Sequence, residues 1–446
     1  MTVKAVIITG QASETDSTQA RNLLMAGGMT LFARQLKTLK AIGIEEVHVI
    51  TDWYIPDFEA AATTCTEAPK AIFIHHTREA AKNLQDACGT HDHLLVLEEG
   101  MIVDQRILHA VMAGQHDTHR AHLAFLPRNR LPDHITAFAT PFTAHNNPGF
   151  FGGIALIPAT ILQNSFSGFA DATLMQQMLQ NLAQQPENHI IDISQIPLYV
   201  NEEHADIPLT WMPLTRREDR DKATRLLLVP TDIMPRSWPE KLIYTPIENW
   251  LSLKFCHLPS TPSLTFWLRI IFSLLIVIML AAGPGVMTLA GIFIAIIVSL
   301  GIGVGPKLAA LKRQYHAPPL WQVWIARMCE YGWFLALGST LALAEKQPLL
   351  FALALIVVLF QAADDQQRLM FRVLSHRPLR RVSKTDQRLH SVLAERDTLL
   401  WAILPFLIVE EWQIGLIVTA TYSVISFFIR QTRLKRALQN KSPLNT

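Results

Sequence analysis

Hydrophobic residues follow different patterns in the two halves of the chain. Up to about Leu228, short β-branched runs alternate with amphipathic segments. The predicted strands are Val3–Thr9, Glu46–Thr51, Lys70–His75, His93–Glu98, Gly152–Pro158 and His189–Ile193. The predicted helices are Leu31–Ile42, Arg78–Ala87 and Asp171–Ala183. Because strands and helices alternate, the pattern predicts an α/β domain whose parallel sheet is covered by helices on both faces.

From Leu264 onward the apolar residues form six long stretches. These are Leu264–Ala282, Val286–Val304, Trp321–Ala344, Pro348–Ala363, Thr398–Val409 and Trp412–Ile429. Several approach the ~20 residues that a helix needs to cross the hydrocarbon core of a bilayer. The alternative is a set of buried core helices, but three tight apolar pairs in succession favour membrane spans. We therefore expect an all-α domain of six transmembrane helices.

A proline-rich segment joins the two halves. Within it, Pro246–Leu258 places Trp250 and leucines beside Lys254 and His257, a pattern typical of a helix that lies in the membrane interface. The predicted organisation is a soluble domain at 1–228, a linker with an interfacial helix at 229–262, a membrane domain at 263–436 and a tail at 437–446.

Basic residues gather on one side of the predicted membrane domain. Sixteen Lys and Arg residues lie in the loops after the second and fourth spans and in the tail, whereas the opposite turns contain only Lys346. By the positive-inside rule, the soluble domain and both termini should be cytoplasmic, in a bacterial inner membrane. The basic face could meet anionic lipid headgroups or phosphate-bearing substrates. The alternative is that these residues only fix the topology.

The composition narrows the classes of function. The chain has 446 residues, of which 50% are hydrophobic and 17% charged, so it is not disordered, collagenous or a coiled coil. The net charge of +2 argues against general nucleic-acid binding. Four cysteines lie far apart and form no C-x-x-C pair, so neither a disulfide framework nor a Cys-based zinc site is expected.

The N-terminal residues resemble nucleotidyltransferases that activate sugar or polyol phosphates. A strand and a polar loop are followed by Arg21-Asn22-Leu23-Leu24-Met25-Ala26-Gly27-Gly28, where that family has a glycine-rich loop and Lys-Pro-Leu-Leu-Pro-Val-Gly-Gly. The resemblance covers roughly the first 160 residues. It implies a GT-A or Rossmann-like domain that binds nucleotide through Gly10, Arg21, Gly27 and Gly28. It also implies that Glu98 or Glu99, which follow a strand where the family has its metal aspartate, binds Mg²⁺ or Mn²⁺.

The loop before Arg21 departs from that family. Ser13–Thr18 contains Glu14 and Asp16 where glycines and a phosphate-binding arginine are expected. Like charge opposes a triphosphate, so we expect CTP to bind weakly at best. The alternative to a working nucleotidyltransferase is a surviving fold without turnover.

The membrane half resembles the CDP-alcohol phosphatidyltransferases, which also have six spans. The resemblance is carried by Lys307-Leu308-Ala309, Tyr331–Gly338 and Ser391–Asp397. In that family, four aspartates of a D-x-x-D-G-x-x-A-R…G-x-x-x-D-x-x-x-D signature hold divalent metal against the diphosphate of a CDP-alcohol. Here the four positions are Ile302, Gly305, Val323 and Arg327. The resemblance therefore implies the fold without the metal centre.

Arg327 and Glu330 are the leading candidates for a substitute site. They lie three positions apart on one helix face, so we predict that they pair inside the third span and replace the lost metal charge. The alternative is that Arg327 snorkels to the interface. Lys307 is a further catalytic candidate. Asp364 and Asp365 could bind metal, although such a pair also commonly caps a span.

Taken together, the two halves resemble bifunctional synthases that make CDP-inositol and then a phosphoinositol lipid. This implies a role in phospholipid headgroup assembly, with Mg²⁺ or Mn²⁺ as cofactor if the protein is active. The missing aspartates favour a catalytically silent homologue that binds lipid or nucleotide or supports an active partner enzyme. The alternatives are an enzyme with a divergent site, a membrane scaffold, or a lipid transporter or flippase. The expected partners are membrane lipids with anionic headgroups, a CDP-alcohol or CTP, and a second copy or a partner enzyme.

Overall fold

The computed structural model describes most of the chain. The described residues are 2–51, 55–65, 68–74, 77–89, 92–128, 139–162, 172–200, 205–233, 236–258, 262–314, 319–375 and 384–439. They form two compact units. The first comprises Met1–Leu198, Pro208–Leu227 and Leu311–Arg313, and the second comprises Tyr199–Ile207, Leu228–Ala310 and Gln314–Thr446.

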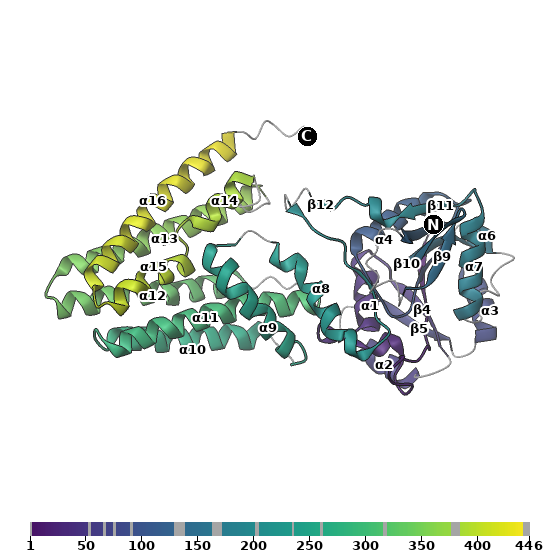
Figure 1. The fold of residues 1–446 in the computed structure, drawn as a ribbon, viewed down its shortest axis with the longest axis horizontal. Coiled ribbons are helices and arrows are strands. Elements are labelled where there is room, and N and C mark those ends of the chain that lie inside the picture. The colour runs from purple at the N-terminus through teal and green to yellow at the C-terminus, as the bar shows by residue number, and fades with distance from the viewer. Residues whose placement is uncertain are drawn as a thin grey trace. The chain divides into compact units, whose positions relative to one another are not determined.

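An eight-stranded sheet forms the centre of the first unit (Figure 1). Its strands are β1 (Val3–Ile8), β4 (Glu46–Ile50), β5 (Lys70–Ile74), β6 (His93–Leu97), β8 (His122–Pro127), β9 (Pro141–Ala144), β10 (Asn147–Pro158) and β11 (His189–Asp192). They follow the order β11-β8-β10-β6-β1-β4-β5, and β9 pairs with β10. Strands β1, β4, β5 and β6 are parallel, as the sequence predicts.

The prediction of a wholly parallel sheet is wrong at β10. This long strand runs antiparallel to β6, β8 and β9. A tight hairpin, in which His145 and Asn146 both have positive φ (44° and 65°), accounts for the antiparallel pairing of β10 with β9. Such a turn returns the chain beside the strand it has just left. The sheet is therefore mixed, and β11 joins it parallel to β8.

Alternate residues of the central strands face opposite sides of the sheet. Ala5 and Ile7 of β1 pack in one apolar core with residues of α1 (Leu31–Ala41), α2 (Ile55–Thr63) and α4 (Gln105–Met112). Val6 and Ile8 pack in a second core with residues of α3 (Thr77–Ala87), α6 (Ala159–Leu162) and α7 (Ala172–Gln184). Figure 1 shows these two helical layers on the two faces of the sheet. The predicted cover of helices on both faces is confirmed.

Short elements complete the connections between the main strands and helices. They are η1 (Arg21–Leu23), β2 (Met25–Ala26), β3 (Met29–Thr30), β7 (Met101–Val103), η2 (Ala113–His116), η5 (Ile193–Gln195), β12 (Tyr199–Val200), β13 (Ala205–Asp206), β14 (Trp211–Pro213), η6 (Arg217–Asp219) and α8 (Arg220–Asp232).

Apart from the short strands β12 and β13, the described part of the second unit consists of helices, and each of the six predicted apolar stretches lies largely in one of them. Its helices are η7 (Glu240–Tyr244), α9 (Thr245–Phe255), α10 (Pro262–Ala281), α11 (Val286–Leu311), α12 (Leu320–Ala344), α13 (Pro348–Ser375), α14 (Lys384–Val392), α15 (Arg396–Ile408) and α16 (Trp412–Gln439). Three are long and apolar enough to cross a membrane, over Val286–Leu311, Pro348–Val373 and Trp412–Ala437. These helices indicate a membrane protein.

The other three apolar stretches form helices that meet this description less well. The apolar part of α10 is shorter, Thr265–Ala281. Helix α12 has 25 residues, but Arg327 and Glu330 interrupt its apolar sequence. Helix α15 has 13 residues.

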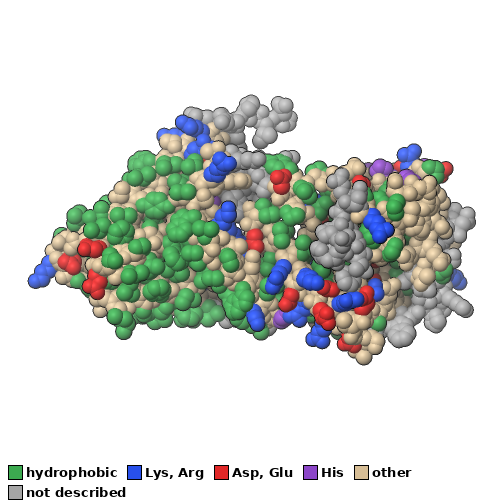
Figure 2. All heavy atoms as spheres, viewed as in Figure 1, with side chains coloured by type: hydrophobic (Ala, Val, Ile, Leu, Met, Phe, Trp, Pro, Cys, Tyr) green, Lys and Arg blue, Asp and Glu red, His purple; other side chains and the backbone are tan. Residues whose placement is uncertain are grey.

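Large apolar side chains cover the outside of the helical unit (Figure 2). Only 33%, 28% and 39% of the apolar windows of α11, α13 and α16 are buried within the protein. Val286 and Leu343, for example, are 82% and 80% exposed. Inside the unit, Ile276, Trp333 and Ile403 belong to one close-packed core. An apolar surface of this extent is typical of helices that face lipid.

Candidate functional site

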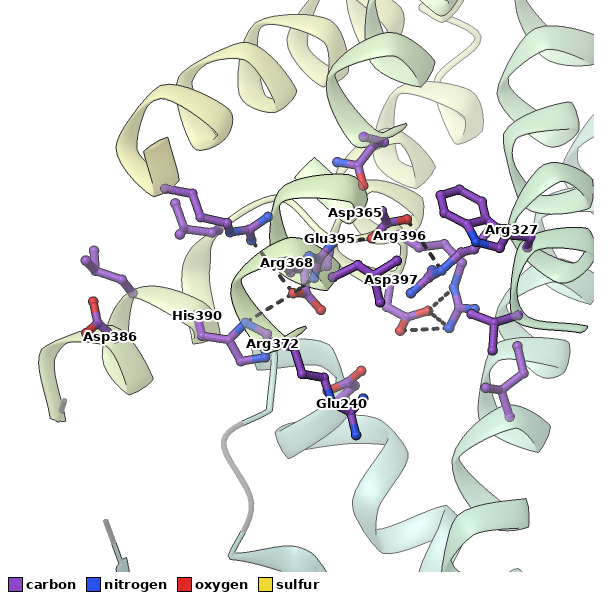
Figure 3. A pocket seen from close by; sticks show the side chains of 18 of the residues that line it. Glu240, Arg327, Asp365, Arg368, Arg372, Asp386, His390, Glu395, Arg396 and Asp397 are labelled. Carbon is purple, nitrogen blue, oxygen red and sulfur yellow. Dashed lines mark hydrogen bonds and ion pairs between the residues drawn. The ribbon is translucent and has the colours of Figure 1, made fainter. Parts of the chain in front are cut away.

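A cavity of 510 Å³ lies among the helices of the second unit (Figure 3). Seven arginines line it: Arg269, Arg327, Arg368, Arg372, Arg396, Arg430 and Arg433. Five carboxylates also line it: Glu240, Asp365, Asp386, Glu395 and Asp397. The apolar part of the wall includes Ile302, Leu320, Val323, Trp324, Leu369, Leu389 and Leu393. The cavity therefore combines a dense set of guanidinium groups with an apolar side.

Glu330 of α12 is the buried carboxylate beside this cavity. Arg327 Nη1 donates to its Oε2 at 3.0 Å, so the predicted pair is present. Arg396 Nη1 donates to its Oε1 at 2.6 Å, and Arg269 Nη2 donates to the same oxygen. The Glu330 side chain is only 3% exposed. Because a buried charge is costly unless it is compensated, these three guanidinium groups from α10, α12 and α15 keep the carboxylate stable.

Asp364 and Asp365 of α13 are also held by arginines. Arg368 Nη2 lies 2.7 Å from Asp365 Oδ1 and 3.0 Å from Asp364 Oδ2. Asp365 Oδ2 accepts from the Tyr331 hydroxyl at 2.8 Å and lies 3.4 Å from Arg327 Nε. Arg430 pairs with Asp364. Both predicted metal candidates are thus ion-paired with guanidinium groups.

The start of α15 brings a further set of charges to the cavity. Glu395 is the N-cap of the helix and forms a capping box with Thr398. Figure 3 shows Arg368 and His390 converging on Glu395, at 2.6 Å and 3.1 Å from its Oε1. Arg396 pairs with Asp397 at 2.9 Å. The start of α15 therefore supplies one hydrogen-bond acceptor, Glu395, and one donor, Arg396, to the charged groups around the cavity.

The family signature can now be placed in the structure. Ile302, Val323 and Arg327 line the cavity, whereas Gly305 does not. Among the described residues, no group of three His, Cys, Asp or Glu side chains could hold a metal ion. Of the nearby carboxylates, Glu240 accepts from the Ser237 N–H, and the others are paired with arginines: Asp364, Asp365, Asp386, Glu395 and Asp397. This donor set does not fit the divalent metal that the resemblance implies.

Lys307 of α11 lies in a separate buried cluster. Its Nζ is 2.9 Å from Asp232 Oδ1 and 3.1 Å from Glu248 Oε2, and it donates to Asn249 Oδ1 at 2.5 Å. Arg236 completes the cluster at 2.7 Å from Glu248. Lys307 does not line the cavity. Its contacts join α11 to α9, and its buried position keeps it out of reach of a ligand in the cavity.

A second cavity, of 290 Å³, lies in the α/β unit. Arg21, Glu98, Glu99 and Thr140 are among the polar residues that line it, and Phe142 is among its apolar residues. Thr140 donates to Glu98 Oε1, whereas Glu98 Oε2 is buried and has no hydrogen-bond partner among the described residues. Burial raises the pKa of Glu98 to about 7. Glu98 is therefore close to half-protonated at neutral pH.

Glu99 fastens the loop that follows β1. Its Oε1 accepts from Thr9 Oγ1 at 2.8 Å, and its Oε2 accepts from the N–H groups of Gly10 at 3.1 Å and Gln11 at 3.0 Å. Consecutive backbone N–H groups of this kind are a natural site for an anion. Here the anion is a side chain of the protein itself. Both Glu99 oxygens are thus engaged, and among the described residues the two glutamates have no third possible metal ligand beside them.

The two acidic residues of the polar loop, Glu14 and Asp16, both have hydrogen-bond partners among the described residues. Arg216 Nε donates to Glu14 Oε2 at 2.7 Å, and this contact lowers the pKa of Glu14. Asp16 accepts from the Thr18 backbone and hydroxyl at 2.9 Å and 2.5 Å. Glu14 lines the 290 Å³ cavity together with Glu98 and Glu99.

Gly27 and Gly28 have a structural explanation. They form the turn between β2 and β3, with φ values of 61° and 80° that favour glycine. The Gly27 N–H donates to Thr224 Oγ1 at 3.0 Å. Neither residue lines the 290 Å³ cavity, whereas Arg21 does.

Sequence reasoning missed several residues of the arginine-lined cavity. In the sequence, Arg368, Arg396 and Arg430 are only members of the basic face, which either meets phosphate-bearing groups or fixes the topology, and Arg269 is not singled out. A signal for Arg269 is present in the sequence, because it is a lone charge within an otherwise apolar stretch. Its partner Glu330 is 61 residues away, so no local pattern could show the contact.

Comparison with known proteins found similar solved structures but no matching family or curated sequence. No protein-family profile and no curated protein sequence matches the chain. A glucose-1-phosphate thymidylyltransferase from Bacillus anthracis is 12% identical with a TM-score of 0.36, over 50% of this chain and 94% of that chain. A CTP:phosphocholine cytidylyltransferase from Streptococcus pneumoniae is 11% identical with a TM-score of 0.35, over 51% of this chain and all of that chain (100%). These structural neighbours of the N-terminal half are nucleotidyltransferases, and at these scores they carry no conclusion about substrate or activity.

Proposed function

We propose that the chain is an integral membrane protein of the CDP-alcohol phosphatidyltransferase class, which acts in phospholipid headgroup assembly by binding a phosphate-bearing ligand without transferring it. The observation that supports this proposal is the arginine-lined cavity. Three of the four signature positions, Ile302, Val323 and Arg327, lie on its wall. The residues of the signature thus surround a hollow, as a site would require, but they supply no metal ligand.

The chemistry of the wall favours binding over transfer. A guanidinium group recognises phosphate oxygens with a planar fork of donors. Transfer from a CDP-alcohol also needs a group that activates the acceptor hydroxyl and a charge that stabilises the leaving phosphate. The carboxylates that could act as a base, such as Asp365 and Glu395, are paired with arginines at 2.7 Å and 2.6 Å. An ion-paired carboxylate is a poor proton acceptor, because its charged form is stabilised.

In this proposal all six helices α10, α11, α12, α13, α15 and α16 cross the bilayer, and both termini are cytoplasmic. The support is the excess of basic residues on one side of the helices. Helix α9 would lie in the interface, where its Ile247 and Trp250 side chains are 38% and 58% exposed. Reporter fusions after Thr446 and within 345–347 should report opposite sides of the membrane. Reports from the same side would contradict six spans.

The proposed loss of transfer is tested with the purified full-length protein. CDP-diacylglycerol is supplied with Mn²⁺ or Mg²⁺ and a set of alcohol acceptors, and release of CMP is followed. We expect no release above that of a heat-denatured sample, while binding of lipid persists. Metal-dependent release of CMP would instead support the alternative of an active enzyme with a divergent site.

A further inference from the structure

We infer that the arginine-lined cavity binds the phosphodiester group of a membrane phospholipid through guanidinium groups alone, at the place where related enzymes use a divalent metal. This inference rests on the proposed function and names the ligand of that same site. Three features carry it: donors without acceptors, a nearly balanced charge, and an apolar wall that is open to the surroundings.

The first feature is a set of buried guanidinium nitrogens that lack an acceptor. Arg269 Nε, Arg368 Nε and Arg430 Nη2 are buried and donate no hydrogen bond to any described residue. The Arg430 side chain is only 6% exposed, and its Nη2 lies 3.7 Å from Glu395 Oε1, beyond hydrogen-bond distance. Buried donors without acceptors are rare because each costs free energy. Phosphate oxygens inside the cavity would supply the missing acceptors.

Arg372 adds a donor at the edge of the cavity. It lines the wall, its side chain is exposed, and no ion pair joins it to the described residues. A negatively charged ligand can therefore pair with Arg372 without breaking an existing ion pair. Arg372 is also a residue whose loss should leave the fold intact.

The second feature is the charge balance around the cavity, which fits one negative charge. The seven lining arginines face seven carboxylates, which are the five that line the wall together with their neighbours Glu330 and Asp364. Burial beside Asp397 and Glu395 raises the pKa of Glu240 to about 7, so that this carboxyl is partly neutral near pH 7. Counted over these arginines and carboxyl groups alone, the surplus is thus at most about one positive charge. A phosphodiester carries a single negative charge, whereas a diphosphate would bring more charge than the wall can neutralise.

The third feature is the apolar wall, which favours a lipid over a free phosphate. Leu320 and Val323 of α12 line the cavity and are also 65% and 41% exposed. Their neighbours Trp321 and Ile325 are 52% and 43% exposed on the same helix. Acyl chains can therefore lie against α12 while the phosphate reaches the arginines. Contact of an acyl chain with this apolar surface stabilises a bound lipid, and an inorganic ion cannot gain that contact.

The test uses the full-length protein in detergent with dihexanoyl phosphatidylglycerol, which carries one phosphodiester charge. Binding is measured by titration calorimetry in EDTA and again with Mn²⁺, and inorganic phosphate is titrated as a separate probe. We expect equal affinity for the lipid in both buffers, within a factor of two, and at least tenfold weaker binding of inorganic phosphate. Lipid binding that EDTA abolishes would overturn the inference, and equal binding of inorganic phosphate would overturn the lipid assignment.

Variants locate the ligand. Arg372→Gln should weaken lipid binding at least threefold without a change in melting temperature, because no ion pair is lost. Arg430→Gln should weaken it about tenfold or more, as expected for a charged hydrogen bond in a buried site. Arg388→Gln is the matched control, because Arg388 is exposed on α14 and does not line the cavity. Equal effects of Arg372→Gln and Arg388→Gln would overturn the inference, even if Arg430→Gln fails to fold.

The inference and the proposed function can fail separately. Release of CMP would contradict the proposed function, whatever the effect of EDTA on lipid binding. Metal-dependent lipid binding without release of CMP would contradict only the inference.

Discussion

Replacement of Glu330 should destabilise the helical unit strongly, because this one carboxylate compensates three guanidinium groups. In Glu330→Leu, Arg269, Arg327 and Arg396 lose a shared partner whose side chain is 3% exposed. Removal of one member of a buried ionic group typically costs about 3–5 kcal/mol. At about 2–4 °C for each kcal/mol in a unit of this size, the melting temperature should fall by roughly 10 °C.

Replacement of Arg327 should be much milder. Its side chain is 34% exposed, and Glu330 keeps two other donors in its absence. We expect Arg327→Leu to cost about 1 kcal/mol, the value of a partly screened charged hydrogen bond. The double variant Arg327→Leu/Glu330→Leu should melt close to Glu330→Leu, because Arg269 and Arg396 still lack their partner.

These three variants separate a shared carboxylate from an isolated ion pair. The assay is thermal unfolding in detergent, followed by tryptophan fluorescence, with Glu411→Leu as a control for loss of an exposed carboxylate. An isolated pair would show partial recovery of the melting temperature in the double variant. Such a recovery, or a fall of less than about 2 °C in Glu330→Leu, would refute the three-way compensation.

Three further predictions concern other parts of the protein. Gly303→Ala should lower the melting temperature by several degrees, since a β-carbon there would overlap Glu248 Oε1, whereas Gly301→Ala on the same helix has open space and should not. Glu99→Ala should raise the affinity of the full chain for CTP about tenfold in calorimetry, because the N–H groups of Gly10 and Gln11 become free to bind phosphate. Unchanged affinity would show that these N–H groups do not bind phosphate. Lipid binding should weaken as the pH rises from 6 to 8. Glu240, which faces Asp397, Glu395 and His390, loses its proton near pH 7 and so adds a negative charge to the cavity. The same pH profile in Glu240→Gln would contradict this.

Local periodicity was enough to predict most of the elements. The strand at Val3–Ile8 is a short continuous apolar run because it is buried on both faces, and the helix at Leu31–Ala41 shows helical spacing of its apolar residues. The part of β10 that precedes the predicted strand Gly152–Pro158 was missed because Asn147, Pro148 and Gly149 are typical of loops. In the structure these glycines allow close packing: a β-carbon would lie 2.5 Å from Leu126 O at Gly149 and 2.5 Å from Ala124 Cβ at Gly152. Contacts with a neighbouring strand therefore require glycine at these two positions, and a local sequence pattern does not show such contacts.

The candidate site was predictable only in part, for a similar reason. The contact between Arg327 and Glu330 follows from helical spacing, since residues three apart share a face. The contacts of Glu330 with Arg269 and Arg396 span 61 and 66 positions, and they depend on how α10 and α15 pack against α12. The same limit applies to Lys307, which resembled a catalytic residue in sequence and is instead buried against Asp232 and Glu248.

The claim that arginines replace metal in this cavity is tested most directly by native mass spectrometry of the protein extracted from membranes in EDTA. The account predicts that the wild-type protein carries one phospholipid and no divalent metal, and that Arg372→Gln combined with Arg430→Gln loses the lipid while Arg388→Gln keeps it. A wild-type protein that retains lipid only after Mn²⁺ or Mg²⁺ is added, together with a stoichiometric metal adduct, would contradict the account.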